Sequence, residues 1–131
     1  MIKITNLILN EIIEYSKNSL PAEACGYLAG SGDVLSVCYK IRNVDDSPEH
    51  FTMDVSQQFN AYKDARKNGF EIKAVFHSHP STPARPSEED KRLAYDQNIF
   101  QIIVSLAEDN PVVKCFKIEN GDAREIIMEV I

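Results

Sequence analysis

The sequence predicts an α/β domain in which helices cover a mixed β-sheet. Two observations support this class: three segments have a helical pattern, and several short segments are apolar or alternate between apolar and polar residues. The two kinds of segment are interspersed along the chain, which favours stacked layers of helix and sheet. With 131 residues the chain is long enough for one core and too short for two. We therefore expect a single domain over residues 1–131.

The first half of the chain contains the clearest helix. Ile8, Ile12 and Tyr15 form one apolar stripe, which predicts a helix over residues 6–19, and Pro21 ends it. A short edge strand is expected before it, at residues 1–4. After it we expect a hairpin of two strands, at residues 25–29 and 34–42. A polar loop over residues 43–54 leads to a second helix from Val55, which ends at Asn68-Gly69.

The second half of the chain is richer in strands. We expect a strand over residues 71–78, a proline-rich loop, and a third helix from Ser87 to about Asn98. Residues 99–106 are almost continuously apolar, as expected for a strand covered on both faces. Pro111 separates it from a strand at residues 112–118, and Asn120-Gly121 predicts a hairpin turn into a last strand at residues 124–131.

The stretch that joins the strand at residues 71–78 to the third helix carries the residues best suited to chemistry. His77 and His79 are two apart on the strand, so their side chains share a face while Ser78 turns away. Three prolines stiffen the loop that follows, and Asp90 lies in the first turn of the helix. Two imidazoles and one carboxylate could close three corners of a tetrahedron. Three protein ligands, with the fourth position left to water, are the arrangement of catalytic zinc.

Each half of this pattern also has a simpler interpretation. Ser87 and Asp90 fit a capping box, in which two side chains satisfy free amides at the start of a helix. His77 and His79 could be ordinary polar residues at the end of a strand. Their combination favours a metal site, because four residue types must fall at fixed places in two kinds of element.

His77-x-His79-Pro80, followed after the loop by Ser87-x-x-Asp90, resembles the JAMM motif of the JAMM/MPN metallopeptidases. The segment PAEACGYLAG, which contains Glu23, is similar to the upstream glutamate segment of that family. The resemblance spans nearly the whole chain and is closest to the short, stand-alone prokaryotic members. It implies a three-layer, cytidine-deaminase-like sandwich with a mixed β-sheet flanked by helices.

The resemblance also implies a role for each motif residue. His77, His79 and Asp90 would hold Zn²⁺, which supplies an activated water. Glu23 would take the proton from this water as it attacks a carbonyl and would later give it to the leaving amine. Ser87 would donate a hydrogen bond to the oxyanion that forms on the substrate.

JAMM/MPN members cut peptide or isopeptide bonds, so the resemblance implies a hydrolase. The expected partner is its substrate, a ubiquitin-like or sulfur-carrier protein that is cut after its C-terminal Gly-Gly. A narrow groove beside the metal would suit such a tail, because only glycine lets the backbone approach closely. The choice between a peptide and an isopeptide bond stays open, as does the oligomeric state.

Two other functions fit parts of the sequence. Two histidines and one carboxylate also hold Fe(II) in oxygenases, although such sites usually lie in all-β barrels and three helices are expected here. A non-catalytic MPN scaffold is the second alternative, which the intact motif disfavours. A zinc deaminase is disfavoured because the sequence lacks the His-x-Glu and Pro-Cys-x-x-Cys signature of those enzymes.

Composition limits the partners and the compartment. The net charge of −6 argues against nucleic acid or an anionic membrane as a partner. No apolar run approaches the roughly 20 residues of a membrane helix, and the N-terminus lacks the pattern of a signal peptide. The three cysteines include no Cys-x-x-Cys and are expected to be free thiols, which fits a cytoplasmic protein.

Four further residues could have a chemical role because of their side chains or because they lie near the motif. We expect His50 to be solvated or structural and Cys25 to be a buried packing residue. Arg85 and Arg92 flank the motif and could hold a carboxylate of the substrate.

Overall fold

The fold is described from a computed structural model that covers residues 1–131. The three helices are α1 (Asn6–Ser19), α2 (Val55–Lys67) and α3 (Glu88–Arg92). The strands are β1 (Ile2–Ile4), β2 (Cys25–Gly30), β3 (Val34–Leu35), β4 (Val37–Ile41), β5 (Glu71–His79), β6 (Phe100–Ser105), β7 (Val112–Glu119), β8 (Asp122–Ile126) and β9 (Met128–Val130). The polar loop at residues 43–54 is irregular, as predicted, apart from one bridge between Asn43 and Met53.

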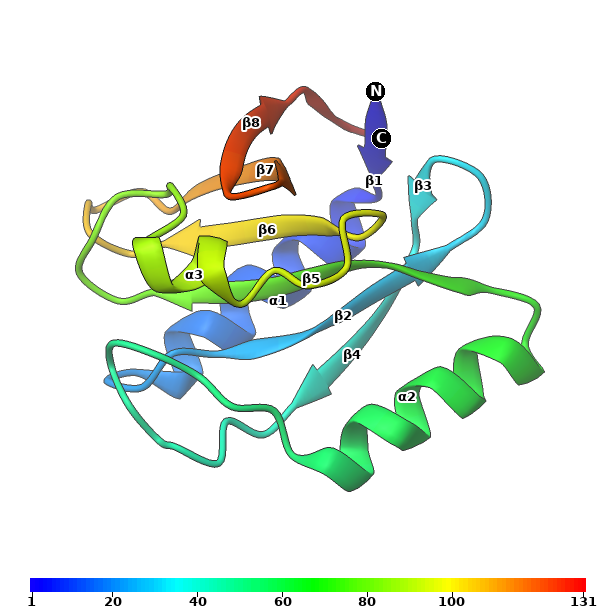
Figure 1. Ribbon diagram of the computed structural model, residues 1–131, viewed down its shortest axis with the longest axis horizontal. Coiled ribbons are helices and arrows are strands. Elements are labelled where there is room, and N and C mark those ends of the chain that lie inside the picture. Colours follow the sequence, from blue (N-terminus) through cyan, green and yellow to red (C-terminus); the bar gives the residue numbers. More distant parts are fainter.

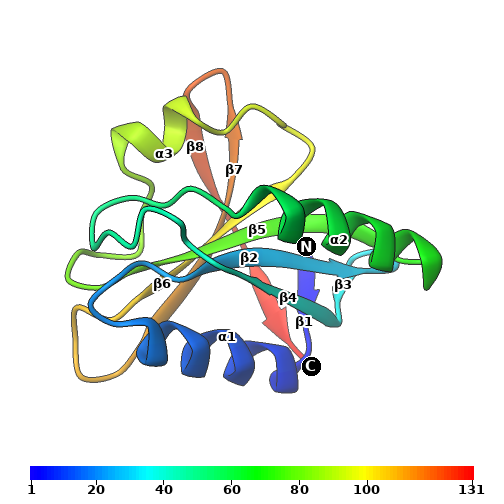
Figure 2. The ribbon, with the colours of Figure 1, turned by 90° about the horizontal axis from the view of Figure 1, so that it is seen from below.

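The main sheet has six strands in the order β4-β2-β5-β6-β7-β8. All neighbouring strands are antiparallel except β5 and β6, so the sheet is mixed, as expected. Helix α1 covers one face of the sheet, and α2 and α3 lie over the other, which gives three layers (Figures 1 and 2). The predicted α/β class with a mixed sheet flanked by helices is therefore confirmed.

A second, three-stranded sheet has the order β3-β1-β9 and corrects three predictions. β1 is its central strand and not an edge strand. The expected strand at residues 34–42 divides at Ser36, so that β3 pairs with β1 while β4 pairs with β2. The expected last strand at residues 124–131 likewise divides at Ile127 into β8 and β9. Alternating polarity predicts an extended chain, but it does not show where the chain changes its pairing partner.

The third helix is much shorter than predicted: it ends at Arg92 and not near Asn98. A short helix is stable in a protein mainly when one of its faces is buried, and α3 buries no residue. The next apolar side chains do not change this, because Leu93 and Tyr95 are exposed. Instead, the Asp96 carboxylate accepts a hydrogen bond from the backbone N–H of Asn98, which favours a turn.

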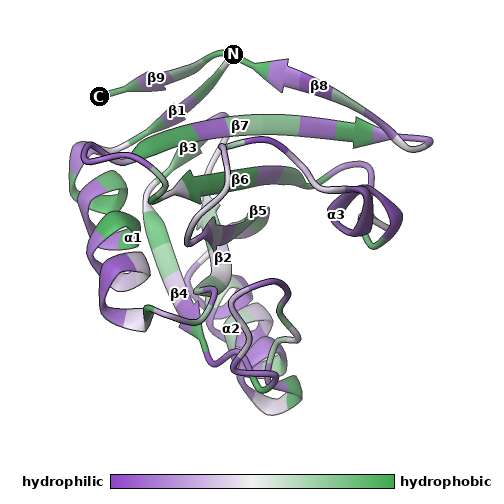
Figure 3. Cartoon of the chain, turned by 90° about the vertical axis from the view of Figure 1, so that its left-hand side faces the viewer, coloured by the Kyte–Doolittle hydropathy of each residue, from purple (hydrophilic) through white to green (hydrophobic).

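The two faces of the main sheet have different cores. On the α1 side, Ile8 and Ile12 pack with residues of β2, β5 and β6, including Leu28 and Phe76. Apolar and polar residues accordingly run side by side along α1, whereas α3 is mostly hydrophilic (Figure 3). On the other side, a smaller cluster lies under α2 and a third lies under the proline-rich loop. Strand β6 is therefore covered on both faces, as its apolar sequence predicts.

None of the three helices combines the length and the apolar character that a membrane-spanning helix requires.

Phe76 supplies a test of this layering, because its ring is fully buried between α1 and the sheet. We expect Phe76→Ala to lower the free energy of unfolding by about 3–5 kcal/mol, through lost burial and an unfilled cavity. Phe59 on α2 is 64% exposed and is the matched control, for which Phe59→Ala should change stability by about 0.5 kcal/mol or less. Urea denaturation followed by circular dichroism measures both. Similar losses in the two variants would contradict the assignment of the core.

Candidate metal centre and its groove

Strand β5 and helix α3 bring the three predicted metal ligands together. His77 and His79 are the last alternate residues of β5 and point to the face of the sheet that α2 and α3 cover. Ser78 points the other way, and its hydroxyl accepts a hydrogen bond of 2.8 Å from the backbone N–H of Ala24. Asp90 approaches from the first turn of α3. The pairing of β5 between β2 and β6 thus fixes where both imidazoles point.

The side-chain atoms of these residues have a spacing that suits a metal ion. His77 Nε2 lies 3.1 Å from His79 Nε2, and each of these nitrogens lies 3.2 Å from the same Asp90 oxygen, Oδ2. Ligand atoms about 2.0–2.1 Å from a tetrahedral zinc ion lie about 3.3 Å from one another. The three residues therefore fit three corners of such a site, and two imidazoles with a carboxylate are a donor set that zinc accepts.

The proline-rich loop holds His79 in the orientation that this site needs. His79 Nδ1 lies 2.9 Å from the carbonyl oxygen of Pro83, an acceptor, so Nδ1 carries a proton, and the neutral imidazole would have Nε2 free as a ligand. The Ser105 hydroxyl donates to the carbonyl oxygen of Thr82 at 2.6 Å. The side chain of Ala84 is buried against Ile103 and others, which anchors the loop to the sheet. These ties make the loop a fixed part of the site.

Ser87 and Asp90 form the capping box that the simpler interpretation predicted. The Ser87 hydroxyl accepts from the backbone N–H of Asp90 at 3.0 Å, and Asp90 Oδ2 accepts from the backbone N–H of Ser87 at 2.9 Å. The same Oδ2 faces both imidazoles. Burial would raise the pKa of Asp90, but the hydrogen bonds from His77 and His79, together with the charge of His77, hold it well below its usual range. The Asp90 carboxylate can therefore cap helix α3 and also face a metal ion.

Glu23 lies just before β2, on the same face as the two histidines. Cys25 pairs with His77 in the antiparallel ladder, so two residues earlier Glu23 stands opposite His79. Its side chain is only 5% exposed, and Oε1 has no hydrogen-bond partner in the protein. Burial raises its pKa to about 8, with the charge of His79 opposing this and the charges of Asp90 and Glu89 adding to it. Glu23 is therefore a buried carboxyl group able to exchange a proton near neutral pH.

Burial would lower the pKa of His79, but the hydrogen bonds to Asp90 and to the Pro83 carbonyl outweigh this effect and raise the pKa above its usual value.

The imidazole of His77 is covered by an aromatic ring. The ring of Phe51 stacks on it, with ring centres 4.8 Å apart, and its Nδ1 is buried without a partner. Sequence reasoning missed Phe51, for which an aromatic residue within an otherwise polar loop was the one available signal.

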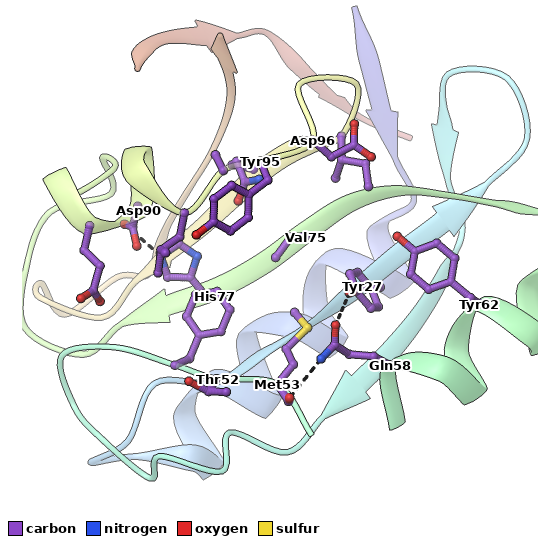
Figure 4. Close-up of a pocket in the computed structure, with 16 residues that line it drawn as sticks. Tyr27, Thr52, Met53, Gln58, Tyr62, Val75, His77, Asp90, Tyr95 and Asp96 are labelled. Carbon is purple, nitrogen blue, oxygen red and sulfur yellow. Dashed lines mark hydrogen bonds and ion pairs between the residues drawn. The ribbon is translucent and has the colours of Figure 1, made fainter. Parts of the chain in front are cut away.

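A groove of about 410 Å³ leads to His77 and Asp90. Its floor includes Val75 and Tyr27, and its sides come from α2 and from the segment after α3. In Figure 4, His77 and Asp90 lie toward one end, while Tyr62 and Asp96 mark the other. The sequence did not reveal this groove, because its sides are more than 30 residues apart in the chain.

Four residues named from the sequence have other surroundings. His50 is exposed, and its Nδ1 lies 3.1 Å from a carboxylate oxygen of Asp45, consistent with a structural role. Cys25 is buried and donates to the carbonyl oxygen of Ile41, and burial raises its pKa to about 12. A thiolate nucleophile at this position is therefore disfavoured. The side chains of Arg85 and Arg92 are exposed, and Arg92 forms a surface ion pair with Glu89 at 3.8 Å.

Two relatives of this chain have names that state an activity. A CysO-cysteine peptidase from Mycobacterium tuberculosis is 27% identical over 128 residues, which cover 95% of this chain and 87% of that protein. A desampylase from Pyrococcus furiosus is 38% identical over 74 residues, which cover 56% of this chain and 52% of that protein.

Three solved structures share the fold. A solution structure of a protein from Desulfitobacterium hafniense has a TM-score of 0.90 and 46% identity, and the match covers 100% of this chain and 93% of that one. A JAB1/MPN domain protein from Archaeoglobus fulgidus has a TM-score of 0.70 and 27% identity, with 99% and 97% covered. A structure described as JAMM, a metalloprotease-like zinc site in the proteasome and signalosome, has a TM-score of 0.66 and 26% identity, with 100% and 98% covered.

The family model Prok-JAB, prokaryotic homologs of the JAB domain, matches residues 6–119. This match spans every residue of the metal centre, from Glu23 to Asp90. The motif-based resemblance to JAMM/MPN proteins is thereby confirmed, and the chain belongs to the family of prokaryotic homologs of the JAB domain.

Proposed function

We propose that this protein is a zinc-dependent hydrolase that cuts the peptide or isopeptide bond after the C-terminal Gly-Gly of a ubiquitin-like or sulfur-carrier protein. One observation carries the proposal. Three atoms with the spacing of zinc ligands and one buried carboxyl group with a raised pKa share one face of the sheet, and two of the ligand residues, His77 and Asp90, line a groove. Named relatives that are a peptidase and a desampylase support the hydrolase class.

His77, His79 and Asp90 would hold the zinc ion. When bound, zinc would supply a Lewis acid and a water that is acidic enough to act as nucleophile near neutral pH. The zinc site named for one structural relative supports this choice of metal. An Fe(II) oxygenase is less well supported, because its ligands usually lie in an all-β barrel and here they lie between a sheet and a helix.

Glu23 would act as the general base and then as the general acid. A proton carrier works best when its pKa lies near the working pH, and burial raises the pKa of Glu23 toward neutrality. Its Oε1, free of protein partners, would accept the proton as the nucleophile attacks the carbonyl carbon. The same carboxyl group would then deliver that proton to the leaving amine, so that the amine departs neutral.

Ser87 would stabilise the negative charge that develops on the carbonyl oxygen. Its hydroxyl oxygen already accepts a hydrogen bond from the N–H of Asp90, but a hydroxyl can accept and donate at once. The Ser87 proton therefore stays available for the oxyanion. A positioned donor of this kind contributes about 3–4 kcal/mol to transition-state stabilisation in other hydrolases.

The groove supports an extended tail as substrate. It is open, largely apolar, and ends at His77 and Asp90, so that a chain lying in it would present its last bond to the metal centre. The ring of Phe51, which stacks on His77, and Leu93 are among the residues that line the groove. Glycine is the residue best able to bring its backbone close to such side chains, which supports a Gly-Gly tail.

The function can be tested by the intact mass of a ubiquitin-like sulfur carrier that is extended past its Gly-Gly. We expect metal-loaded protein to remove the extension, chelated protein to leave it intact, and Glu23→Gln to be slower by roughly 10²–10⁴-fold at unchanged metal content. Glu14→Gln on α1, on the far face of the sheet, is the matched control and should cleave at the wild-type rate. Cleavage by the chelated protein would contradict a metal-dependent reaction.

Zinc should stabilise the folded protein if His77, His79 and Asp90 bind it. At a free zinc concentration 1,000-fold above the dissociation constant, the expected gain is about 4 kcal/mol, measured as a rise in the melting temperature. His79→Ala should abolish that gain because it removes one of three ligands. His50→Ala is the control, since His50 lies outside the metal centre, and it should retain the full gain. An equal rise in both variants would show that zinc binds elsewhere.

The raised pKa of Glu23 predicts a pH-dependent stability cost in the metal-free protein. Between the ordinary pKa of 4.5 and about 8, the folded state keeps a proton that the unfolded chain has released. Stability therefore falls as the pH rises through this window. Glu23→Gln has no proton to lose, so relative to wild type it should gain roughly 2 kcal/mol between pH 5 and pH 8. Denaturant unfolding at both pH values measures the difference, and parallel profiles would disprove it.

A further inference from the structure

The sheet holds Ala24, which is bonded to Ser78 of β5, but the backbone groups of Glu23 itself are bonded to a loop. Glu23 precedes β2, so its backbone groups are outside the ladder that pairs β2 with β5. Its N–H donates to the carbonyl oxygen of Ser47 at 2.8 Å, and its own carbonyl oxygen accepts from Asn43 Nδ2 at 3.1 Å. Both partners belong to the loop between β4 and α2.

The Asn43 side chain makes four hydrogen bonds, which use both of its N–H donors and both acceptor positions of its oxygen. Nδ2 donates to Glu23 and also to the carbonyl oxygen of His50, each at 3.1 Å. Oδ1 accepts from the backbone N–H groups of Asp45 and Thr52, also at 3.1 Å each. Among the natural side chains of this size, only an amide offers this set of donors and acceptors. Asn43 therefore closes the loop at both ends and ties it to Glu23.

The position of the Glu23 carboxyl group depends strongly on this backbone anchor. Its Oε1 is buried and contacts no donor in the protein, so no side-chain hydrogen bond at that atom fixes it. The other end of the same loop carries Phe51, whose ring stacks on His77. One loop thus connects the backbone of Glu23 with a side chain of the metal centre.

We propose that Asn43 is a positioning residue that sets the distance between Glu23 and the metal centre. This inference rests on the proposed function, in which Glu23 carries the proton. Asn43 belongs neither to the three predicted metal ligands nor to the lining of the groove, so it acts through the carbonyl group of Glu23 and through the shape of the loop. A misplacement of about 1 Å in such a group can cost about 10²-fold in rate.

Two variants separate this role from general support of the loop. Asn43→Asp has nearly the same shape and retains the acceptor for Asp45 and Thr52, but it loses both donors, including the one to Glu23. Asp45→Ala is the matched control. It removes the contacts of the Asp45 carboxylate with His50 and with the Thr52 hydroxyl, and it leaves the bond between Asn43 and Glu23 in place.

The first readout is amide hydrogen exchange, measured residue by residue by NMR in the metal-free protein. We expect Asn43→Asp to speed exchange of the Glu23 amide at least 10-fold, because the loop that carries its acceptor, the Ser47 carbonyl, loses its tie to Glu23. Asp45→Ala should leave the Glu23 amide protected, because that tie stays in place. Unchanged protection of Glu23 in Asn43→Asp would overturn the proposal. Asn43→Ala, in which water can replace the side chain, gives the same comparison if Asn43→Asp does not fold.

The second readout is cleavage of the extended sulfur carrier. Asn43→Asp should lower kcat by roughly 10–100-fold, with KM and zinc content unchanged, whereas Asp45→Ala should stay within about threefold of wild type. A normal kcat in Asn43→Asp, despite loss of protection at Glu23, would also overturn the proposal. If wild-type protein leaves the carrier intact, the proposed substrate is wrong, and the exchange experiment still decides whether Asn43 holds Glu23.

Discussion

The antiparallel pairing of β2 with β5 is the interaction on which the rest of the metal centre depends. Its register puts Cys25 opposite His77 and so carries Glu23 to the level of His79. Alternate side chains of β5 point to opposite faces, so Phe76 enters the core under α1 while both histidines point to the other face, where His77 lines the groove. A slip of one residue would exchange these faces. Gly26 protects the register, because a Cβ there would overlap with the Tyr39 carbonyl oxygen and the Phe76 ring.

This arrangement places buried polar atoms without hydrogen-bond partners at one end of the sheet. Glu23 is buried with an unpartnered oxygen, and His77 has an unpartnered buried nitrogen. Such groups lower the stability of the folded protein, and the core under α1 has to offset that loss. The two sides of the sheet therefore contribute differently to stability and to the proposed function. The α1 side supplies burial through a large apolar cluster, and the other side tolerates polar groups because they serve the reaction that we propose.

The sequence predicted the parts of the structure that local patterns determine. Helix α1 has the predicted bounds, and β5 with its two histidines follows from alternation and apolar content. The parts that it did not predict depend on contacts between distant segments. The division of residues 34–42 follows from a change of partner strand, and the short α3 follows from the lack of a surface to bury. The roles of Phe51 and Asn43 likewise depend on where a polar loop folds back, which no local pattern records.

The choice between a capping box and a metal ligand at Asp90 shows why the sequence left two interpretations open. Both describe the same atom. Oδ2 accepts the N–H of Ser87, which restrains the carboxylate against the helix, and it faces His77 and His79 at 3.2 Å. A ligand already held by its helix loses little conformational freedom when a metal binds. In the function that we propose, the cap would therefore prepare the carboxylate for ligation. The same capping box uses the Ser87 hydroxyl only as an acceptor, so its proton would be free to act on a substrate.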